Sequence, residues 1–536
     1  MQRKFKYKLL SFLSNTNYGC PPLRGGEEGG RNTFSSPVLP SKGDNGCKLK
    51  LFFFLSLLIF STITFGQNKY DYHWMLGYNY TDSLEGSEGS LINFNESPPS
   101  IKYMSFSPEI SLGRQIVTMS DENTGDLLFY SNGCVVFDKS NNMMMNGDNL
   151  NPGNIHEEFC KNGLFFYPQG LGMLALPDIS NANGYYLIHA TIRDEGQLFN
   201  IRDTLRYSYI DMKGNNGLGE VTIKNQPIYD QWLDSGLNTC KHADGQSWWL
   251  INLHNESNTF AKFLLDDQGV TFQDTQSIGI APTPRGYQGS FSPDGSLYAW
   301  YGGHHDLQLF DFDRETGDLS NYREIYVNDT LDHGGLSFSP SGRFIYCMTA
   351  KNIYQVDLQN PSGEEELIEV ASLELPPPNS FSGTFGSAML GPDCRIYITA
   401  RNGIKYLTTI DYPDIKGLDC TVKQYDFELP FYNFILSIPN NPHYRIDEPF
   451  PCTYATSTQD TWISDKLLLS PNPTNNVLTI KESQNSAYVI YDIKGNVLLK
   501  GDLQSGTSEI DVSGLASGMY IIVCKENGRH AKFIKI

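Results

Sequence analysis

The chain has 536 residues, a formal net charge of −20 and an aromatic content of 13%. That length allows a large core and more than one domain. The negative charge disfavours nucleic acid and anionic membrane surfaces as partners, because both require a positive surface on the protein. The many Tyr and Phe residues, together with frequent Gly turns, favour strands and an all-β protein.

The first recognisable segment is residues 47–66, which include the run KLKLFFFLSLLIFSTITFG. A short basic start, an apolar run and small residues are typical of a secretory signal, and the run is too short to span a membrane. We expect cleavage between Gly66 and Gln67 and no transmembrane segment in the mature chain. Residues 1–46 are rich in Gly, Pro and Ser and cannot bury a core, so we expect a disordered leader or an over-extended translation start.

A phrase then recurs: FSPDG at residues 291–295, FSPSG at 338–342 and a looser LGPDC at 390–394. Six units share its wider pattern, in which a turn precedes an aromatic strand and a partner strand. Their turns contain Gly125, Gly184, Gly245, Gly295, Gly342 and Cys394, which are 47 to 61 residues apart. This spacing is close to that of four-stranded propeller blades, which stack because a single unit cannot bury both of its faces.

We therefore predict a β-propeller over residues 67–450, with seven blades favoured and six or eight left open. The remaining blade is expected to form when the N-terminal strands YHWMLGYN and SLINFN pair with the last strands of the propeller near PFYNFILSIP. The repeated phrase should mark the beginning of the second strand in successive blades. It should place Phe291 and Phe338 at matching buried positions.

Residues 451–466 are rich in Pro, Thr, Ser and Asp without a period and are predicted to be a linker. Residues 467–536 contain short alternating apolar runs separated by Gly-containing turns, such as NVLTI, AYVIYDI and MYIIVCKE. This pattern predicts a separate small β-sandwich.

The ending, with LLLSPNPTNNVLTI, VIYDIKGNVLLKG and DVSGLASGMYIIVCKENGRHAKFIKI, resembles the type A C-terminal sorting domain of the type IX secretion system of certain Gram-negative bacteria. The matching positions are Pro471, Asn472, Pro473, Gly495, Gly518, Tyr520, Lys532 and Lys535. The resemblance implies translocation across the outer membrane and removal of the domain by a sortase-like peptidase. Release or attachment to surface lipopolysaccharide would follow. We expect both lysines to stay in water, where the export machinery can recognise them.

The propeller region resembles the poorly characterised WD40-like propellers that often precede such sorting domains. GDLLFYSNGCVVFD, CKHADGQSWWLIN, FSPDG and SIPNNPHYR carry this resemblance. These motifs describe blades and turns, so they imply a fold far more than an activity.

Eight cysteines follow the signal, and an even number in an exported protein allows disulfides. We predict a bridge between Cys420 and Cys452, because they bracket the last blade. A disulfide that closes a loop of about 30 residues contributes roughly 3 to 4 kcal/mol to the free energy of unfolding. Buried free thiols remain the alternative for about half of the cysteines.

The acidic run FDFDRETGD at residues 310–318 looks superficially like a calcium loop. A turn closing two strands explains it better, since a calcium loop needs five or more converging oxygens. Loops that enter the innermost strands line the mouth of a propeller channel. His242, Arg285, Tyr287 and His333 are therefore candidate ligand-binding residues, and the alternative is that they are ordinary loop residues bonded to backbone.

No metal, cofactor or catalytic motif occurs in a fitting context. Our leading hypothesis is therefore a secreted or cell-surface propeller, outside a Gram-negative bacterium, that binds a protein or glycan through its loop faces. The type IX machinery and its peptidase would be its export partners. The alternative is an exported hydrolase or lyase with its site at the channel mouth, and the fold itself permits both.

Overall fold

The computed structural model describes residues 68–77, 88–106, 111–113, 116–162, 165–192, 202–234, 236–281, 288–302, 305–327, 334–360, 366–377, 383–401, 404–433, 438–448, 452, 469–482, 485–492, 497–524 and 530–536. The predicted leader, signal and cleavage site, residues 1–66 and Gln67, lie outside these residues. Within the described part of the chain, no helix is both long and apolar enough to cross a membrane.

Seven antiparallel sheets follow one another between His73 and Asn433 in the described residues. The first two are β1 (His73–Leu76), β2 (Glu88–Asn93) and β3 (Ser100–Ser105), then β4 (Val117–Ser120), β5 (Leu127–Ser131) and β6 (Val136–Asp138). The third and fourth are β7 (Leu174–Pro177), β8 (Gly184–Ile192), β9 (Arg202–Asp211) and β10 (Glu220–Tyr229), then β11 (Asn238–Lys241), β12 (Trp248–Leu253), β13 (Thr259–Asp266) and β14 (Gly269–Ser277).

The fifth and sixth sheets are β15 (Gln288–Phe291), β16 (Leu297–Gly302), β17 (His305–Phe312) and β18 (Leu319–Ile325), then β19 (Gly335–Phe338), β20 (Phe344–Met348), β21 (Asn352–Asp357) and β22 (Glu366–Ser372). The seventh is β23 (Phe385–Leu390), β24 (Ile396–Ala400), β25 (Ile404–Ile410) and β26 (Val422–Asn433). Single helical turns occur at η1 (His156–Lys161), η2 (Asn215–Gly217) and η3 (Gly417–Cys420).

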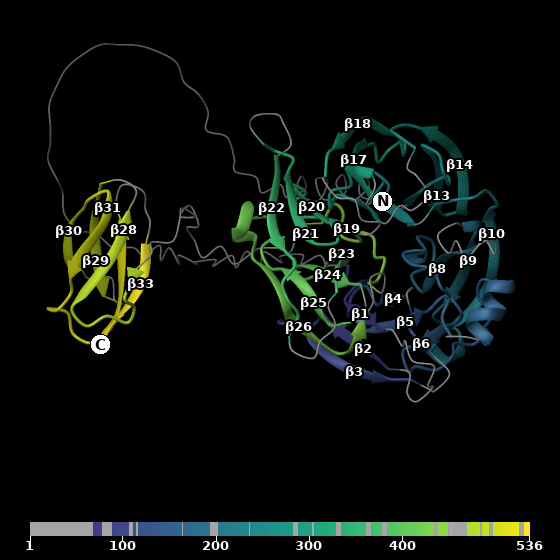
Figure 1. The fold of residues 1–536 in the computed structure, drawn as a ribbon. Coiled ribbons are helices and arrows are strands. Elements are labelled where there is room, and N and C mark those ends of the chain that lie inside the picture. The colour runs from purple at the N-terminus through teal and green to yellow at the C-terminus, as the bar shows by residue number, and fades with distance from the viewer. Residues whose placement is uncertain are drawn as a thin grey trace, which may run out of the picture. The chain divides into compact units, whose positions relative to one another are not determined.

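In each sheet, strands adjacent in the chain pair with one another, and the first strands of successive sheets lie side by side around a common axis (Figure 1). The protein is therefore an all-β propeller, and its described residues form seven blades. The sequence-based fold class is confirmed.

The repeated phrase is the end of the innermost strand and the turn that follows it. Phe291 is the last residue of β15 and Phe338 the last of β19, and both are buried. Gly295 and Gly342 each have a φ of +72°, and Cys394 occupies the same turn position with a φ of +73°. These residues end the turn because they adopt a left-handed backbone conformation that Gly tolerates best. The matched positions of the two Phe residues are confirmed, although the phrase precedes the second strand rather than beginning it.

The ring closes differently from the prediction. The N-terminal strands pair with each other, since β1 pairs with β2 and β2 with β3, while β26 pairs with β25 of the last blade. The first and last blades meet through side chains instead: the rings of Trp74 and Phe94 pack edge to face against Tyr397, at 5.4 and 5.7 Å between centroids. Aromatic packing between two complete sheets thus replaces strand pairing within one shared sheet.

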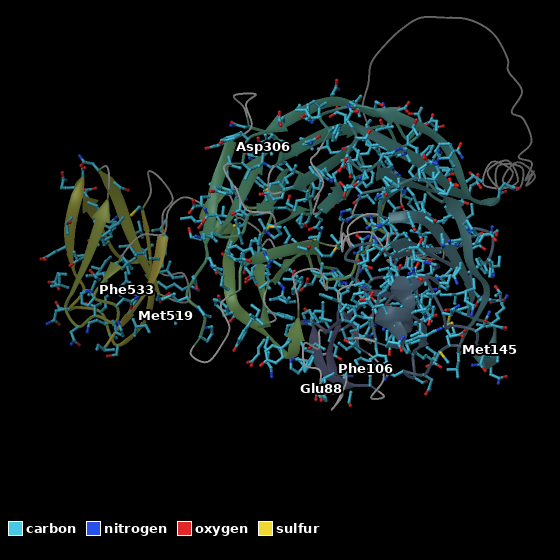
Figure 2. The ribbon with its side chains drawn as sticks, turned by 45° about the vertical axis from the view of Figure 1, so that its right-hand side comes forward. Glu88, Phe106, Met145, Asp306, Met519 and Phe533 are labelled. Carbon is cyan, nitrogen blue, oxygen red and sulfur yellow. A yellow bond between two sulfur atoms is a disulfide. The ribbon has the colours of Figure 1, made fainter. Side chains whose placement is uncertain are left out.

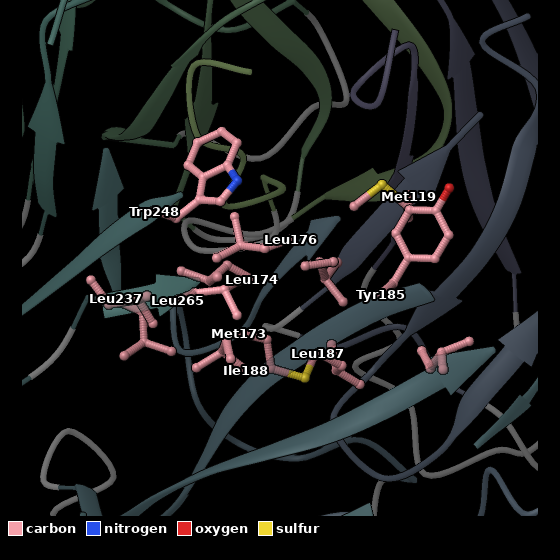
Figure 3. Close-up of a cluster of buried hydrophobic side chains, with 14 of the residues drawn as sticks. Met119, Met173, Leu174, Leu176, Tyr185, Leu187, Ile188, Leu237, Trp248 and Leu265 are labelled. Atoms are coloured by element: carbon pink, nitrogen blue, oxygen red, sulfur yellow. The ribbon is translucent and has the colours of Figure 1, made fainter. Parts of the chain in front are cut away.

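Apolar side chains fill the spaces between blades. The largest cluster joins the second, third and fourth blades and includes Met119, Leu174, Leu187, Trp248 and Leu265 (Figure 3). These residues come from inner and middle strands, so the core of each interface lies near the axis and holds the inner strands in place.

Two further sheets lie between Leu469 and Lys535 and share one apolar core. One sheet consists of β27 (Leu469–Ser470), β28 (Val477–Glu482) and β31 (Gly506–Asp511), and the other of β30 (Val497–Leu503), β29 (Ser486–Asp492), β32 (Gly518–Cys524) and β33 (His530–Lys535). Leu478 and Ile510 of the first sheet belong to the same buried cluster as Ile490 and Ile522 of the second. This is a small β-sandwich, as the sequence predicts.

Candidate functional site: the channel and the sorting domain

A segment that follows the last blade, Ile438–Glu448, runs along the inner strands, and we call it the channel segment. At its beginning, Asn440 Nδ2 lies 2.8 Å from the carbonyl oxygen of Leu237, just before β11, and 3.4 Å from that of Met173, just before β7. Further along, Tyr444 donates a hydrogen bond to the Ala175 carbonyl within β7. Lys241, the last residue of β11, donates from its ammonium to the Tyr444 carbonyl. The segment therefore follows β11 from its beginning to its end.

Charged side chains fix the other end of the channel segment. Arg445 donates two hydrogen bonds to Asp71, at 2.5 and 2.8 Å, and the two side chains are only 12% and 4% exposed. Arg314 binds Asp447 in the same two-pronged way, but the Asp447 side chain is 52% exposed. A buried charge is stable only when it is paired, so the Asp71–Arg445 pair ties the segment firmly to the start of the ring.

A disulfide joins Cys452, four residues beyond the channel segment, to Cys394 in the turn between β23 and β24. The predicted Cys420–Cys452 bridge is therefore wrong. Cys420 is a free buried thiol in η3, packed in the cluster of Tyr346, Ile410 and Phe344. Cys394 is accessible to Cys452 because the channel segment ends beside the turns that follow the inner strands.

A second disulfide, Cys134–Cys160, joins η1 to the turn after β5.

His443 lies in the middle of the channel segment, where its Nε2 is 3.0 Å from the carbonyl oxygen of Phe291. Burial, helped by the nearby Arg445 guanidinium, lowers the pKa of His443 to about 4. The ring is therefore neutral at pH 7, and its Nε2–H donates to the carbonyl. Its role is to hold the segment against the end of β15.

The space left between the channel segment and the inner strands β11, β15, β19 and β23 is a cavity of about 30 Å³. Its lining is neutral and includes Asn238, Gln288 and Asn441. Both side-chain amide atoms of Asn441 are buried without a hydrogen-bond partner among the described residues. A water needs roughly 10 to 15 Å³ of such space, so the cavity has room for about two waters that can bond this amide. It is too small for a sugar ring or a peptide side chain.

Gln288 holds three inner strands together at this cavity. Its Oε1 accepts hydrogen bonds from the backbone N–H groups of Leu336 in β19 and Ala388 in β23, and its Nε2 donates to the Ala388 carbonyl at 2.6 Å. The residue itself belongs to β15 and is 4% exposed. Three hydrogen bonds of its amide go to the backbone, so Gln288 supports the channel wall by linking the inner strands.

Of the four residues predicted to bind a ligand, only His242 is described. It lies in the turn between β11 and β12, where its Nδ1 accepts from the Asp244 backbone N–H and its Nε2 is 3.1 Å from the Glu315 carbonyl. It does not line the channel cavity. Arg285, Tyr287 and His333 lie outside the described residues, so their convergence stays a prediction.

The acidic run at residues 310–318 forms a turn, as the sequence favours. The Asp313 carboxylate accepts from the backbone N–H of Glu315, and Gly317 N–H donates to the Asp313 carbonyl. Asp318 pairs with the buried Lys262 of the preceding blade, and Asp311 pairs with Arg323. The carboxylates thus serve separate contacts, and no group of three or more potential metal-ligating side chains occurs among the described residues.

In the C-terminal domain, the Pro471-Asn472-Pro473 segment lies against the last strand. Asn472 Oδ1 accepts from the Ile534 backbone N–H, and its Nδ2 donates to the Lys532 carbonyl. The backbone of Thr474 continues this contact by donating to the Ile534 carbonyl and accepting from Ile536. The motif therefore covers the free edge of β33, which would otherwise expose unpaired backbone groups.

The prediction that both lysines stay in water is wrong for Lys535. Lys532 is exposed, but Lys535 is 8% exposed and its ammonium donates to the Ile536 carbonyl. Strand side chains alternate, so residues 532 and 535 must lie on opposite faces, and Lys535 shares the inner face with Phe533.

The other motif residues of the domain lie in or near β32. Tyr520 stacks on Phe533 at 5.5 Å between ring centroids, and Gly518 begins β32. Gly495 lies outside the described residues.

Comparison with known families identifies this C-terminal domain. Residues 469–536 match the family described as the secretion system C-terminal sorting domain. The domain is thus a type IX sorting domain, and it implies secretion of the protein through that system, to the medium or the cell surface. No curated protein matches the chain.

Solved structures similar to the chain include a putative 6-phosphogluconolactonase from Bacteroides fragilis, with 11% identity over 69% of this chain and 97% of that one and a TM-score of 0.41. The periplasmic gluconolactonase of Pseudomonas aeruginosa has 12% identity over 82% of this chain and 99% of its own, with a TM-score of 0.33. The β-propeller domain of Myceliophteria thermophila Cps50 has 10% identity, covering 59% and 87%, with a TM-score of 0.37. These similarities are too weak to indicate an activity, and the propeller assignment rests on the sheet topology.

Proposed function

We propose that the protein is an exported propeller that binds a protein or glycan ligand outside the cell at its loop surface, with the sorting domain acting only as the export address. The observation that supports this proposal is the channel segment, which lies along the inner strands. Among the described residues, the cavity between this segment and β11, β15, β19 and β23 has a volume of about 30 Å³ and accommodates waters only.

The ends of the channel differ in what they offer a ligand. At the end where the inner strands finish, Asp71, Arg445 and the Cys394–Cys452 disulfide hold the channel segment in place. The inner strands begin at the other end, and in the sequence Tyr287 directly precedes β15, Arg285 lies two residues before Tyr287, and His333 lies two residues before β19. A ligand that contacts these loops needs no opening of the channel, so we assign the binding surface to the entering loops.

The test uses the full mature chain on a glycan array and a peptide array, together with a hydrolase and lyase screen. We expect binding of one ligand class without turnover, and a loss of about tenfold or more in affinity, about 1.4 kcal/mol, for the Arg285→Ala/Tyr287→Ala variant. His242→Ala is the matched control, because His242 contacts its own turn and the Glu315 carbonyl and does not line the channel cavity, and this variant should bind like the parent. Turnover of a substrate would favour the alternative enzyme, and silence in every assay would refute the binding proposal.

We also propose that residues 451–466 are a linker and that the sorting domain can be removed without unfolding the propeller. Cys452 still bonds to the last blade, and Leu469 already begins β27, so the peptidase site would lie between them. Limited proteolysis of the mature chain should cut first between these residues. The remaining propeller should keep the thermal melting temperature that it has in the full chain, and a lower one would contradict the proposal.

A further inference from the structure

The larger sheet of the sorting domain has an apolar outer face. In β32, Tyr520, Ile522 and Cys524 point into the core, so the alternating residues Met519, Ile521 and Val523 point away from it. The strand register places Ile534 opposite Met519, and Tyr491 opposite both Ile521 and Val497. We call this surface the outer face; it consists of Tyr491, Val497, Met519, Ile521, Val523 and Ile534.

Several of these side chains are in contact with water. Met519 is 49% exposed, Ile534 42% and Val497 56%, whereas Phe533, next to Ile534, is fully buried. Figure 2 labels Met519 and Phe533 in the C-terminal domain. Six exposed large apolar side chains are described within residues 469–536, and three of them, Val497, Met519 and Ile534, lie on the outer face, whereas Val477 lies on the other sheet. None of the outer-face residues belongs to the buried cluster of the sandwich. A small domain that concentrates exposed apolar groups on one face presents an interaction surface.

Two lysines border the outer face on opposite strands. Lys532 of β33 stands opposite Ile521, and Lys500 of β30 stands opposite Val489 in the neighbouring row. Both lysines are exposed, and no ion pair involving either one occurs among the described residues. The surface that fits this face is therefore apolar at its centre, with carboxylates at its rim.

We propose that the outer face is the surface through which a component of the type IX export machinery recognises this domain, and that the component presents an apolar patch bordered by acidic side chains. This inference rests on the export role within the proposed function. It replaces recognition through both terminal lysines, because Lys535 is buried with Phe533 and only Lys532 is available.

The test compares single exposed apolar side chains on the two sheets of the domain. The full chain, with its signal, is expressed in a host that has the type IX apparatus, and the ratio of exported to periplasmic protein is measured. Met519→Ser and Ile534→Ser should each lower this ratio about tenfold. Val477→Ser is the matched control, because Val477 is 39% exposed but lies on β28 of the other sheet, and its ratio should not change.

A charge-reversal variant, Lys500→Glu/Lys532→Glu, tests the same face without altering an apolar residue. If a serine variant fails to fold, this variant still shows whether export depends on the outer face. We expect export to fall because the new carboxylates repel an acidic rim. Trypsin resistance of the retained protein identifies variants that fold. Normal export of folded Met519→Ser and Ile534→Ser, equal loss in Val477→Ser, or normal export of the charge-reversal variant would each overturn the inference. Failure of the unmodified chain to leave the cell would instead refute the export role.

Discussion

The propeller and the sorting domain treat their last segments in opposite ways. The propeller turns its final segment inward, where Tyr444 and Ile446 join apolar clusters and Arg445 finds a buried partner. The sorting domain closes its last strand with Asn472 but leaves Met519 and Ile534 in water. The last segment of the propeller thus packs its apolar and charged side chains inside the ring, whereas the sandwich keeps an exposed apolar face, as expected of a domain that another protein must recognise.

The largest expected effect on this difference is that of a substitution at Asp71, which removes the buried partner of Arg445. Asp71→Asn keeps the shape of the side chain but leaves the Arg445 charge buried without a counter-charge, which costs about 3 to 5 kcal/mol of propeller stability. Tryptophan fluorescence during urea unfolding reports mainly the propeller, because five of the six Trp residues lie within residues 67–450, the sixth is Trp462 in the predicted linker, and the sorting domain contains none. Asp447→Asn is the control, since its partner Arg314 pairs with a half-exposed carboxylate, and it should cost less than about 1 kcal/mol. Equal losses in the two variants would show that burial of the pair does not matter.

The disulfide beyond the channel segment should have an effect of similar size. Cys394 and Cys452 are 58 residues apart, and closing such a loop contributes about 4 kcal/mol in the chain-entropy treatment. Cys452→Ser should therefore lower the free energy of propeller unfolding by up to that amount, while Cys420→Ser should leave the disulfide intact. Peptide mapping under non-reducing conditions checks the connectivity, and a peptide that links Cys420 to Cys452 would contradict the structure.

Acid should weaken the propeller through two buried histidines. Burial lowers the pKa of His443 to about 4 and that of His189, which bonds to Asn151 and Ser208, to about 3. Below about pH 6.5 the unfolded chain binds protons that these histidines do not take up in the folded state. The free energy of unfolding therefore falls as the pH drops from 6.5 to 4, by up to about 1.4 kcal/mol per pH unit for each histidine.

His443→Gln isolates one of these contributions, since Gln can still donate to the Phe291 carbonyl. Urea unfolding at pH 7, 6, 5 and 4 should show a shallower loss of stability in the variant than in the parent. The difference should be present at pH 4 and small at pH 7. Parallel pH dependence of parent and variant would mean that His443 takes up its proton normally in the folded state.

The periodic features of the propeller could be read from the sequence. The spacing of Gly125, Gly184, Gly245, Gly295, Gly342 and Cys394 gives six blades, because each of these residues lies between an innermost strand and the second strand of its blade or begins that second strand. The turn at residues 310–318 could also be predicted, since one Asp and one Gly are enough to form it. These features are local, so a single sequence contains them.

The wrong predictions about the ring closure and the disulfide concern contacts between distant parts of the chain. Asn440 and Tyr444 bond to carbonyls more than 200 residues away, and the aperiodic run SIPNNPHYR carries no signal of that path. The disulfide did leave a clue: Cys394 stands where the repeat has Gly, in a left-handed conformation that disfavours a side chain. A residue that departs from the repeat at such a position must have another role, and here that role is bonding to Cys452.

The burial of Lys535 could also have been deduced, since residues 532 and 535 are separated by an odd number and cannot share a face of a strand. The partners of Asn472 could not, because the Pro-Asn-Pro motif lies 60 residues before Lys532 and only the folded domain brings them together. The motif therefore identified the family before its physical role in the domain was visible.

Asn472 gives the smallest expected effect and the one that tests how the sorting domain protects its last strand. Asn472→Ala removes two hydrogen bonds to the β33 backbone at an exposed site, which should cost about 1 kcal/mol and expose the Ile534 amide to solvent. Hydrogen exchange should accelerate at Ile534 while the amides of Ile522 and Val489, in central strands, keep their protection. Asn485→Ala is the control, because Asn485 bonds only the Ser505 amide at another edge and its loss should leave β33 unchanged. If exchange at Ile534 is the same in the parent and in Asn472→Ala, backbone pairing through Thr474 alone closes the edge, and Asn472 must serve recognition instead of structure.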